Sequence, residues 1–210
     1  VPGVPGARVT VIGGGVVGLN AIEMALGLGA SVTVLDRDLG VLERLAARFG
    51  PALRTVYSTT ASLNTEVIGA DLVIGAVLVP GARAPNLVTA DHVAAMRPGS
   101  VLVDVAIDQG GCFETSRPTT HTDPTYLVND VVHYCVANMP GAVPTTSSHA
   151  LNNATLPHVI ALADHGLDAL RTDRNLRNGL NVYAGRVTEP HVAAELGYEH
   201  LSPDEALGLT

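Results

Sequence analysis

Short apolar runs alternate along the chain with segments in which apolar residues recur every three or four positions. The runs are typical of buried strands, and the second pattern is typical of amphipathic helices. Strands are predicted over residues 8–13, 31–36, 53–58, 71–78, 100–107 and 130–138, and helices over 16–30, 38–50, 61–69 and 89–99. Strands separated by single helices predict a parallel sheet covered on both faces, the doubly wound α/β fold of Rossmann type.

The pattern changes after residue 147. Helices are predicted over residues 148–165 and 191–197. The last segment, about 60 residues long, is too short to form an independent core. We therefore expect a Rossmann domain over residues 1–144 and a short helical C-terminal segment over residues 145–210.

Composition narrows the class of protein. The net charge of −8 disfavours a partner such as nucleic acid or an anionic membrane, and no apolar run is long enough for a transmembrane helix. The first residues lack the basic and apolar parts of a signal peptide, and the only cysteines, Cys112 and Cys135, fit buried free thiols in a reducing cytosol. A cytoplasmic protein is therefore expected. All twelve basic residues are arginines, which excludes a Schiff-base lysine or a phosphate-binding lysine within these residues.

A glycine-rich turn lies between the first predicted strand and the first predicted helix. Gly13, Gly15 and Gly18 form the pattern G-x-G-x-x-G, and Gly14 is an additional glycine. Such glycines permit a tight turn, close approach of a pyrophosphate and close helix–strand packing, and the helix N-terminus offers free N–H groups. Asp36 ends the second predicted strand, where a carboxylate accepts hydrogen bonds from ribose hydroxyls. This order predicts dinucleotide binding, with a tight turn that binds no ligand as the alternative.

The same acid bears on the choice of cofactor. The carboxylate of Asp36 repels a 2′-phosphate, so NAD is favoured over NADP. Arg37 follows directly and could bind that phosphate, so the strictness of the preference stays open.

A second candidate site follows the fifth predicted strand. If this strand ends near Ile107, Asp108 projects into the crevice at the carboxyl ends of the strands, and Gly110 and Gly111 leave room for a ligand. There a carboxylate could orient a substrate amine or a water molecule, or Asp108 could simply cap its own loop. Asp104, inside the predicted strand, is expected to be a paired, buried acid.

No metal site is predicted. The eight histidines form no H-E-x-x-H motif, and neither cysteine has a C-x-x-C partner. His158 and His165 lie on a similar helix face, but histidines at a surface or interface are the more common explanation. His133, within a predicted strand, is expected to be a core imidazole.

Several longer strings carry a resemblance to a known family. The strings "VLVDVAIDQGGCFETSRPTTHTDPT", "ADLVIGAVLVPGARAPNLV", "YCVANMPGAVPTTSSHALNNAT" and "LADHG" resemble bacterial alanine dehydrogenases, and the similarity extends from Arg8 to about Leu207. The resemblance implies NAD-dependent, reversible deamination of L-alanine to pyruvate and ammonia. It also implies a homo-oligomer, a hexamer in the complete family enzyme.

The resemblance also assigns roles to residues. It implies that Asp36 holds the adenosine ribose, that Ser58 lies near the adenine, and that Asp108 is the active-site aspartate, which orients the substrate amine or water during proton transfer. Val77 and Leu78 would border the cofactor. Together with the glycine turn, the expected cofactor-binding residues are Gly13, Gly15, Val16, Val17, Gly18, Asp36, Arg37, Ser58, Val77, Leu78, Val136, Asn138 and Met139. Val136, Asn138 and Met139 would line the nicotinamide region.

The sequence departs from the family in one large respect. The family carries a substrate-binding half before the dinucleotide fold, with an Arg and a Lys that bind the substrate and a His that acts as acid and base. This chain starts close to the first Rossmann strand and contains no lysine. We therefore expect a truncated form that binds NAD but does not oxidise alanine alone. Val41 is a smaller departure, at a position where relatives often have Lys.

Two other functions stay open. The chain could be the NAD-binding part of a proton-translocating transhydrogenase, or a non-catalytic NAD-binding module. The string "AIDQGGCFE" favours alanine dehydrogenase over the first of these.

Overall fold

The computed structural model describes residues 2–78 and 84–209. These residues form two compact units, one of residues 2–78 and 84–139 and one of residues 140–209. The sequence had placed the boundary after residue 144. No helix among the described residues has the length and apolar character needed to cross a membrane.

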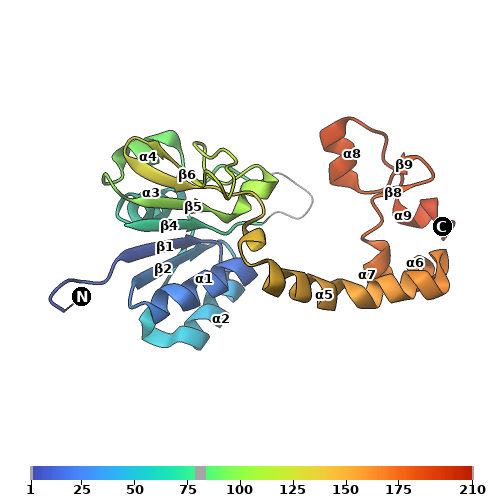
Figure 1. The fold of residues 1–210 in the computed structure, drawn as a ribbon, viewed down its shortest axis with the longest axis horizontal. Coiled ribbons are helices and arrows are strands. Elements are labelled where there is room, and N and C mark those ends of the chain that lie inside the picture. Colours follow the sequence, from blue (N-terminus) through green and yellow to red (C-terminus); the bar gives the residue numbers. More distant parts are fainter. Residues whose placement is uncertain (1, 79–83, 210) are drawn as a thin grey trace. The chain divides into compact units, whose positions relative to one another are not determined.

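The first unit is built around a seven-stranded sheet with the order β3-β2-β1-β4-β5-β7-β6 (Figure 1). Neighbouring strands run parallel except β6, which pairs antiparallel with β7 at the edge. The strands are β1 (Arg8–Ile12), β2 (Ser31–Asp36), β3 (Leu53–Tyr57), β4 (Leu72–Gly75), β5 (Val101–Asp104), β6 (Thr125–Val128) and β7 (Val131–Tyr134). The doubly wound Rossmann fold is thereby confirmed.

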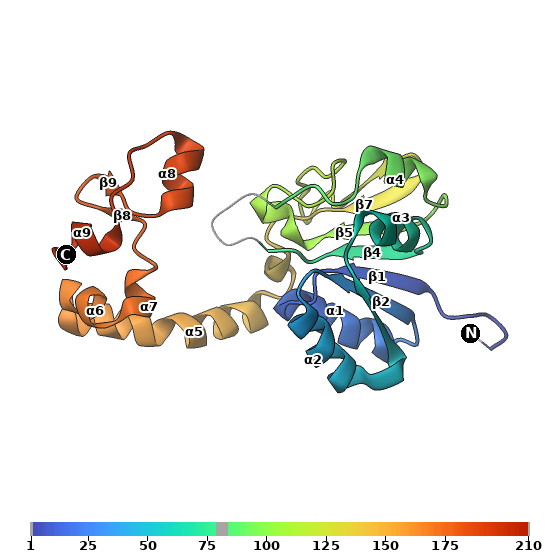
Figure 2. The same cartoon turned by 180° about the vertical axis from the view of Figure 1, so that it is seen from behind.

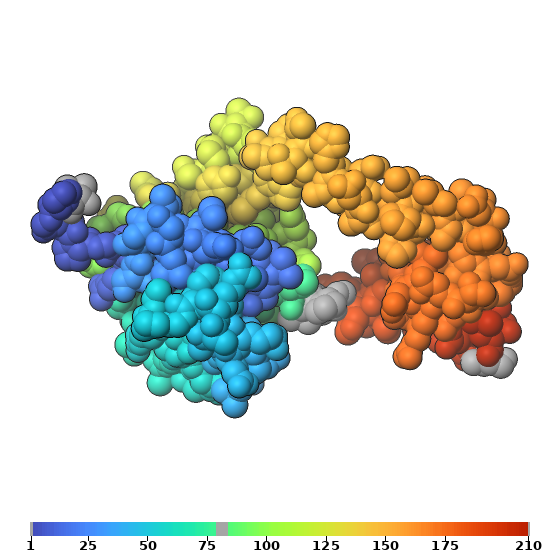
Figure 3. All heavy atoms as spheres, turned by 90° about the horizontal axis from the view of Figure 1, so that it is seen from below, coloured from blue at the N-terminus to red at the C-terminus, as the bar shows by residue number. Residues whose placement is uncertain are grey.

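Alternating side chains of the central strands supply two apolar cores. Val9 and Val11 of β1 face one core, whereas Ile12 faces the other. Helices α1 and α2 cover the first core and lie side by side in blue and cyan in Figure 3, while α3 and α4 cover the second, as the two opposite views show (Figures 1 and 2). These helices are α1 (Val16–Gly27), α2 (Leu39–Phe49), α3 (Thr60–Ile68) and α4 (Ala90–Ala95).

The helix starts follow local hydrogen-bonding chemistry. The side chain of Asp38 accepts hydrogen bonds from the N–H groups of Gly40 and Val41 at the start of α2, and Thr59 and Thr89 form capping boxes at the starts of α3 and α4. Helix α1 differs, because its N-cap is Gly15 and no side chain caps it.

Several sequence-based boundaries were wrong. The predicted strand over residues 71–78 is only β4, and the predicted helix over residues 89–99 ends at Ala95. The fifth strand ends at Asp104 and not near Ile107, because residues Val105–Gln109 form the short 3-10 helix η2. The strand expected over residues 130–138 is only β7, and it pairs with β6, which the sequence analysis missed. The long helix expected from residue 148 is α5 (Pro144–His165), which starts with proline in its first turn and contains Pro157.

The second unit consists of α5 and a small cluster of short elements. These are α6 (Leu167–Thr172), α7 (Arg174–Arg177), β8 (Val182–Tyr183), β9 (Arg186–Val187), α8 (Pro190–Leu196) and α9 (Pro203–Ala206). The buried residues of the cluster are Ala169, Leu170, Thr188, Ala193 and Leu207, a small core for about 70 residues.

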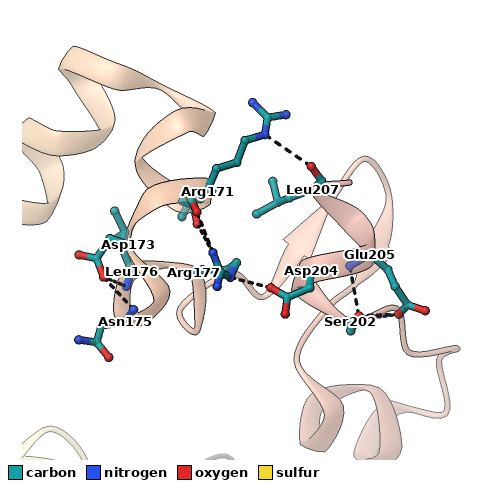
Figure 4. A network of polar contacts seen from close by, with 10 residues as sticks. Arg171, Asp173, Asn175, Leu176, Arg177, Ser202, Asp204, Glu205 and Leu207 are labelled. Atoms are coloured by element: carbon teal, nitrogen blue, oxygen red, sulfur yellow. Dashed lines mark hydrogen bonds and ion pairs between the residues drawn. The ribbon is translucent and has the colours of Figure 1, made fainter. Parts of the chain in front are cut away.

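Polar contacts hold this cluster together. The Nε of Arg177 lies 2.7 Å from Oδ1 of Asp204, and Arg171 donates to the carbonyl of Leu207 (Figure 4). Ser202 and Glu205 form a capping box at the start of α9.

The two remaining short helices are η1 (Gly50–Ala52) and η3 (Met139–Ala142).

Candidate functional site

The candidate residues lie at the carboxyl ends of parallel strands. The glycine turn follows β1, Asp36 ends β2, Ser58 follows β3, and Val77 follows β4. Asp108 follows β5, and residues 136–139 follow β7. Because the carboxyl ends of parallel strands meet at one edge, the topology brings all these positions to the same edge of the sheet (Figure 1).

Two glycines of the turn are required by close packing. Gly13 has φ +98, and a Cβ there would lie 2.6 Å from the carbonyl oxygen of Ala76. A Cβ on Gly18 would lie 1.8 Å from the carbonyl oxygen of Gly13. The N–H of Gly13 donates to the carbonyl of Leu35 at 2.8 Å, which fixes the turn against β2. Helix α1 therefore starts close to β1 and β4.

Gly15 differs from its two neighbours in the motif. A Cβ there would meet nothing within 4 Å, so the backbone at the start of α1 faces open space. Val16 and Val17 follow, with exposed fractions of 80% and 45%. The first N–H groups of a helix have no partner within the helix, and here no side chain caps them. A pyrophosphate fits the chemistry of these donors and the space at Gly15.

The carboxylate of Asp36 is held in place beside this turn. Its Oδ2 accepts a hydrogen bond from the N–H of Gly14 at 2.7 Å, and its Oδ1 accepts one from the N–H of Asp38 at 2.9 Å. Each oxygen keeps a free lone pair, which suits a pair of ribose hydroxyls. The carboxylate thus has a fixed orientation toward the glycine turn.

Gly14 has two structural tasks that the sequence analysis did not identify. Besides donating to Asp36, it packs so closely on α2 that a Cβ would lie 2.7 Å from side-chain atoms of Val41 and Leu45. The sequence shows Gly14 as the middle one of three consecutive glycines. The glycine motif does not specify its contact with α2, because that contact depends on how the helix packs.

The residues that follow Asp36, β3 and β4 have distinct environments. Arg37 is exposed, and Ser58 is half-buried, with its N–H donating to the carbonyl of Asp36 at 2.9 Å. Val77 is half-buried, and its N atom lies close to the position of a Cβ on Gly13. Leu78 has an exposed fraction of 63%. Ser58 and Val77 are thus adjacent in the fold to Asp36 and the glycine turn, respectively.

Asp108 is exposed in η2 and contacts the segment after β7. Its Oδ1 and Oδ2 accept hydrogen bonds from the N–H of Asn138 at 3.2 and 3.3 Å. Asn138 has φ +53, and its carbonyl lies 3.0 Å from Nε2 of His121. The structure therefore joins two of the predicted residues, Asp108 and Asn138, in one contact.

The neighbours of Asn138 differ in burial. Val136 is fully buried, so its side chain belongs to the core and only its backbone can face a ligand. Met139 is half-buried. The contact of His121 with Asn138 had no signal in the sequence, because the two residues belong to different loops.

Gly110 and Gly111 serve the loop itself. Both have positive φ, and Gly110 ends η2 in the left-handed conformation. A Cβ on Gly111 would lie 2.8 Å from Oδ2 of Asp104. Their place in the fold is therefore explained by the turn, without a ligand.

His133 and the two cysteines are buried parts of the fold. His133 is fully buried, with Nδ1 3.0 Å from the carbonyl of Val131 and Nε2 2.8 Å from Oγ1 of Thr115, as expected for a core imidazole. Cys112 and Cys135 are free and buried. Within residues 2–78 and 84–209, no three His, Cys, Asp or Glu side chains come together as metal ligands would.

Comparison with known proteins gives consistent matches. Residues 1–190 match the family model described as alanine dehydrogenase/PNT, C-terminal domain. The alanine dehydrogenase of Halomonas elongata is 60% identical over 209 residues, covering 99% of this chain and 56% of the relative. That of Mycolicibacterium smegmatis is 55% identical over 197 residues, covering 93% of this chain and 53% of the relative. The chain thus spans about half the length of the curated relatives it matches.

Solved structures give the same picture. An L-alanine dehydrogenase superposes with a TM-score of 0.85 at 55% identity, over 94% of this chain and 55% of the other. A transhydrogenase from Sinorhizobium meliloti superposes with a TM-score of 0.63 at 31% identity, over 69% of this chain and 42% of the other.

Proposed function

The chain belongs to the alanine dehydrogenase/PNT family, and from this premise we propose that it is the NAD-binding part of an L-alanine dehydrogenase. The reaction is the reversible, NAD-dependent deamination of L-alanine to pyruvate and ammonia. The observation that carries the proposal is the identity of 60% to an alanine dehydrogenase over 99% of the chain. The uncapped start of α1 beside Asp36 supports it independently.

The residues at the sheet edge divide the work of holding the cofactor. The N–H groups at Gly15, Val16 and Val17 receive the pyrophosphate, and Asp36 accepts hydrogen bonds from the adenosine ribose. Ser58 lies on the adenine side, next to Asp36. Because Asp36 repels a 2′-phosphate, NAD binds in preference to NADP, although Arg37 stands beside it.

The nicotinamide side is assigned to the ends of β4, β5 and β7. Val77, Leu78, Asn138, Met139 and the backbone of Val136 line this side. When bound, NAD accepts the hydride that leaves the substrate carbon. Asp108 orients the substrate amine or the attacking water and takes part in proton transfer.

Two further features complete the proposal. The 210 residues bind NAD but oxidise alanine only together with a substrate-binding part, since they contain no lysine that could bind the substrate. The complete protein is a cytoplasmic homohexamer, as the resemblance to bacterial alanine dehydrogenases implies.

Calorimetry and an activity assay test this function. We expect the purified chain to bind NAD, to bind NADP more weakly, and to form no NADH from alanine. Adding the unmatched part of the Halomonas elongata relative should restore NADH formation. If the purified chain is folded but binds no NAD, the proposal is wrong.

A transhydrogenase part is the second candidate, favoured by the superposition on the transhydrogenase structure. The identity of 31% to that protein, against 55% to the L-alanine dehydrogenase structure, makes it the weaker one. It predicts that NAD binds but that alanine is never oxidised, even after complementation.

A further inference from the structure

Asp104 is a buried acid next to the candidate site with no part in the function described so far. It ends β5 and has an exposed fraction of 0%. Within the described residues, no Arg or His side chain forms an ion pair with it. The predicted burial of this acid is therefore confirmed. A buried carboxylate without a cation as its partner needs other hydrogen-bond donors.

Five donors converge on this one carboxylate. Oδ1 accepts from the N–H of Ala106 at 3.1 Å and from the thiol of Cys112 at 3.4 Å. Oδ2 accepts from the N–H of Cys112 at 2.9 Å, the N–H of Phe113 at 3.3 Å and the hydroxyl of Ser116 at 2.6 Å. An ionised carboxyl group accepts only, so this set of donors matches its ionised form.

The thiol of Cys112 fits its role as a donor. Burial, and next the negative charge of Asp104, raise the pKa of this thiol well above its ordinary value. The group therefore stays protonated and can donate to Oδ1.

The donors come from both ends of the loop that carries Asp108. Ala106 lies two residues before Asp108, and Cys112 and Phe113 lie four and five residues after it. The carboxylate of Asp104 therefore closes the loop from β5 through η2 to Phe113. Gly111 lets the loop pass so close that no Cβ fits against Oδ2.

We propose that Asp104 is a positioning residue, which fixes the loop of residues 105–113 so that the carboxylate of Asp108 stays in contact with the N–H of Asn138. The proposal rests on the proposed function only for the use of Asp108 in proton transfer. The carboxylate acts through the loop and does not itself touch substrate or cofactor.

Amide hydrogen exchange of the intact 210-residue chain, followed residue by residue by NMR, tests this role. The N–H of Asn138 reports on Asp108, and the N–H of Gly14, which donates to Asp36, is the matched N–H-to-carboxylate contact at the other side of the site. In Asp104→Asn, an NH2 group replaces one of the two carboxylate oxygens, and this group cannot accept the hydrogen bonds that the oxygen accepted. We expect exchange at Asn138 to accelerate about tenfold or more, since hydrogen bonds to a charged group are worth about that factor.

A second variant guards against loss of folding. Ser116→Ala removes one donor to Oδ2 but leaves the carboxylate and its four other donors, so exchange at Asn138 should accelerate less than in Asp104→Asn, about threefold. Ser100→Ala is the control, because Ser100 is also buried and hydrogen-bonded but lies just before β5, at its opposite end. It should leave Asn138 unchanged, and in all three variants Gly14 should exchange as in the unmodified chain.

The outcomes separate the alternatives. If exchange accelerates equally at Asn138 and Gly14, Asp104 only stabilises the fold. If exchange at Asn138 is unchanged in both Ser116→Ala and Asp104→Asn, the position of the loop does not depend on the carboxylate of Asp104. Either result overturns the inference. Titration of the same samples with NAD tests the proposed function separately, because exchange at Asn138 is measured without cofactor.

Discussion

Two glycine-to-alanine substitutions in the glycine turn can separate the effects on folding from the effects on cofactor binding. Gly15 and Gly18 are three residues apart in one motif, but they differ in surroundings. A Cβ on Gly15 meets nothing within 4 Å, whereas a Cβ on Gly18 lies 1.8 Å from the carbonyl oxygen of Gly13. We therefore predict that Gly15→Ala abolishes tight NAD binding in a folded protein, and that Gly18→Ala disrupts the fold itself.

The stability change for Gly15→Ala is small. Gly15 has φ −69, which alanine adopts without strain. The lower entropy of the unfolded chain stabilises the variant by about 0.4–1 kcal/mol, while alanine is a poorer N-cap than glycine by a similar amount. The two effects nearly cancel, so the melting temperature should shift by less than about 5 °C.

The loss of affinity for NAD is larger. The added methyl group occupies the space through which a pyrophosphate approaches the N–H groups at the start of α1. Each hydrogen bond to a charged group contributes about 1.5–3 kcal/mol. Loss of one to two of them, about 3 kcal/mol, raises the Kd for NAD about 100-fold.

Calorimetry with NAD and thermal denaturation of both variants measure the two effects together. For Gly18→Ala we expect a loss of several kcal/mol in the free energy of unfolding, because backbone must move to admit the methyl group. If Gly15→Ala folds and binds NAD as tightly as the unmodified chain, the pyrophosphate does not sit at this turn, and the reasoning is refuted.

Three further predictions follow from single side chains. Asp108→Asn should leave the Kd for NAD unchanged within about twofold but lower kcat of the complemented enzyme about 100-fold or more, measured as NADH formation. Burial lowers the pKa of His133, so the folded state binds fewer protons than the unfolded state. The free energy of unfolding should therefore be highest above about pH 6.5 and fall as the pH drops below that value. His133→Gln should reduce this pH dependence, measured by urea denaturation at several pH values. Cys112 and Cys135 should react with a thiol reagent only after denaturation, because both are fully buried.

Local patterns predicted most of the first unit. Five strands and four helices of the Rossmann core were placed within a few residues, because each strand is a short apolar run between glycine, proline or polar residues. The glycine turn and Asp36 could be predicted for the same reason, since the motif and the strand end are both local. The second unit was less accessible: its short helices and two-residue strands have no periodicity long enough to detect.

The edge strand β6 was missed although a signal was present. Thr125–Val128 and Val131–Tyr134 are joined by Asn129 and Asp130, which both have positive φ. Asn and Asp at the two central positions of a hairpin turn are a known signal for antiparallel strands. The interpretation of residues 130–138 as one parallel strand overlooked this turn, which reverses the chain before β7.

The acids at positions 104 and 108 show where local patterns stop being informative. Asp104 lies in an apolar run, so the pattern predicted a strand that continues through it to about Ile107, with Asp108 just beyond the strand end. In the fold, the side chain of Asp104 accepts a hydrogen bond from the N–H of Ala106 and starts η2, so the strand ends at Asp104, three residues earlier than predicted. Whether a carboxylate in such a run ends a strand depends on the donors around it.

Most of those donors come from residues 112–116, beyond the turn at Gly110 and Gly111. The run that contains Asp104 therefore does not hold the information that decides its conformation. The same contacts determine where Asp108 stands relative to Asn138. The two acids, four residues apart, thus depend on the same loop. The buried carboxylate of Asp104 has its hydrogen-bond donors only because the loop returns to it, and Asp108 is held at the sheet edge only because Asp104 closes that loop.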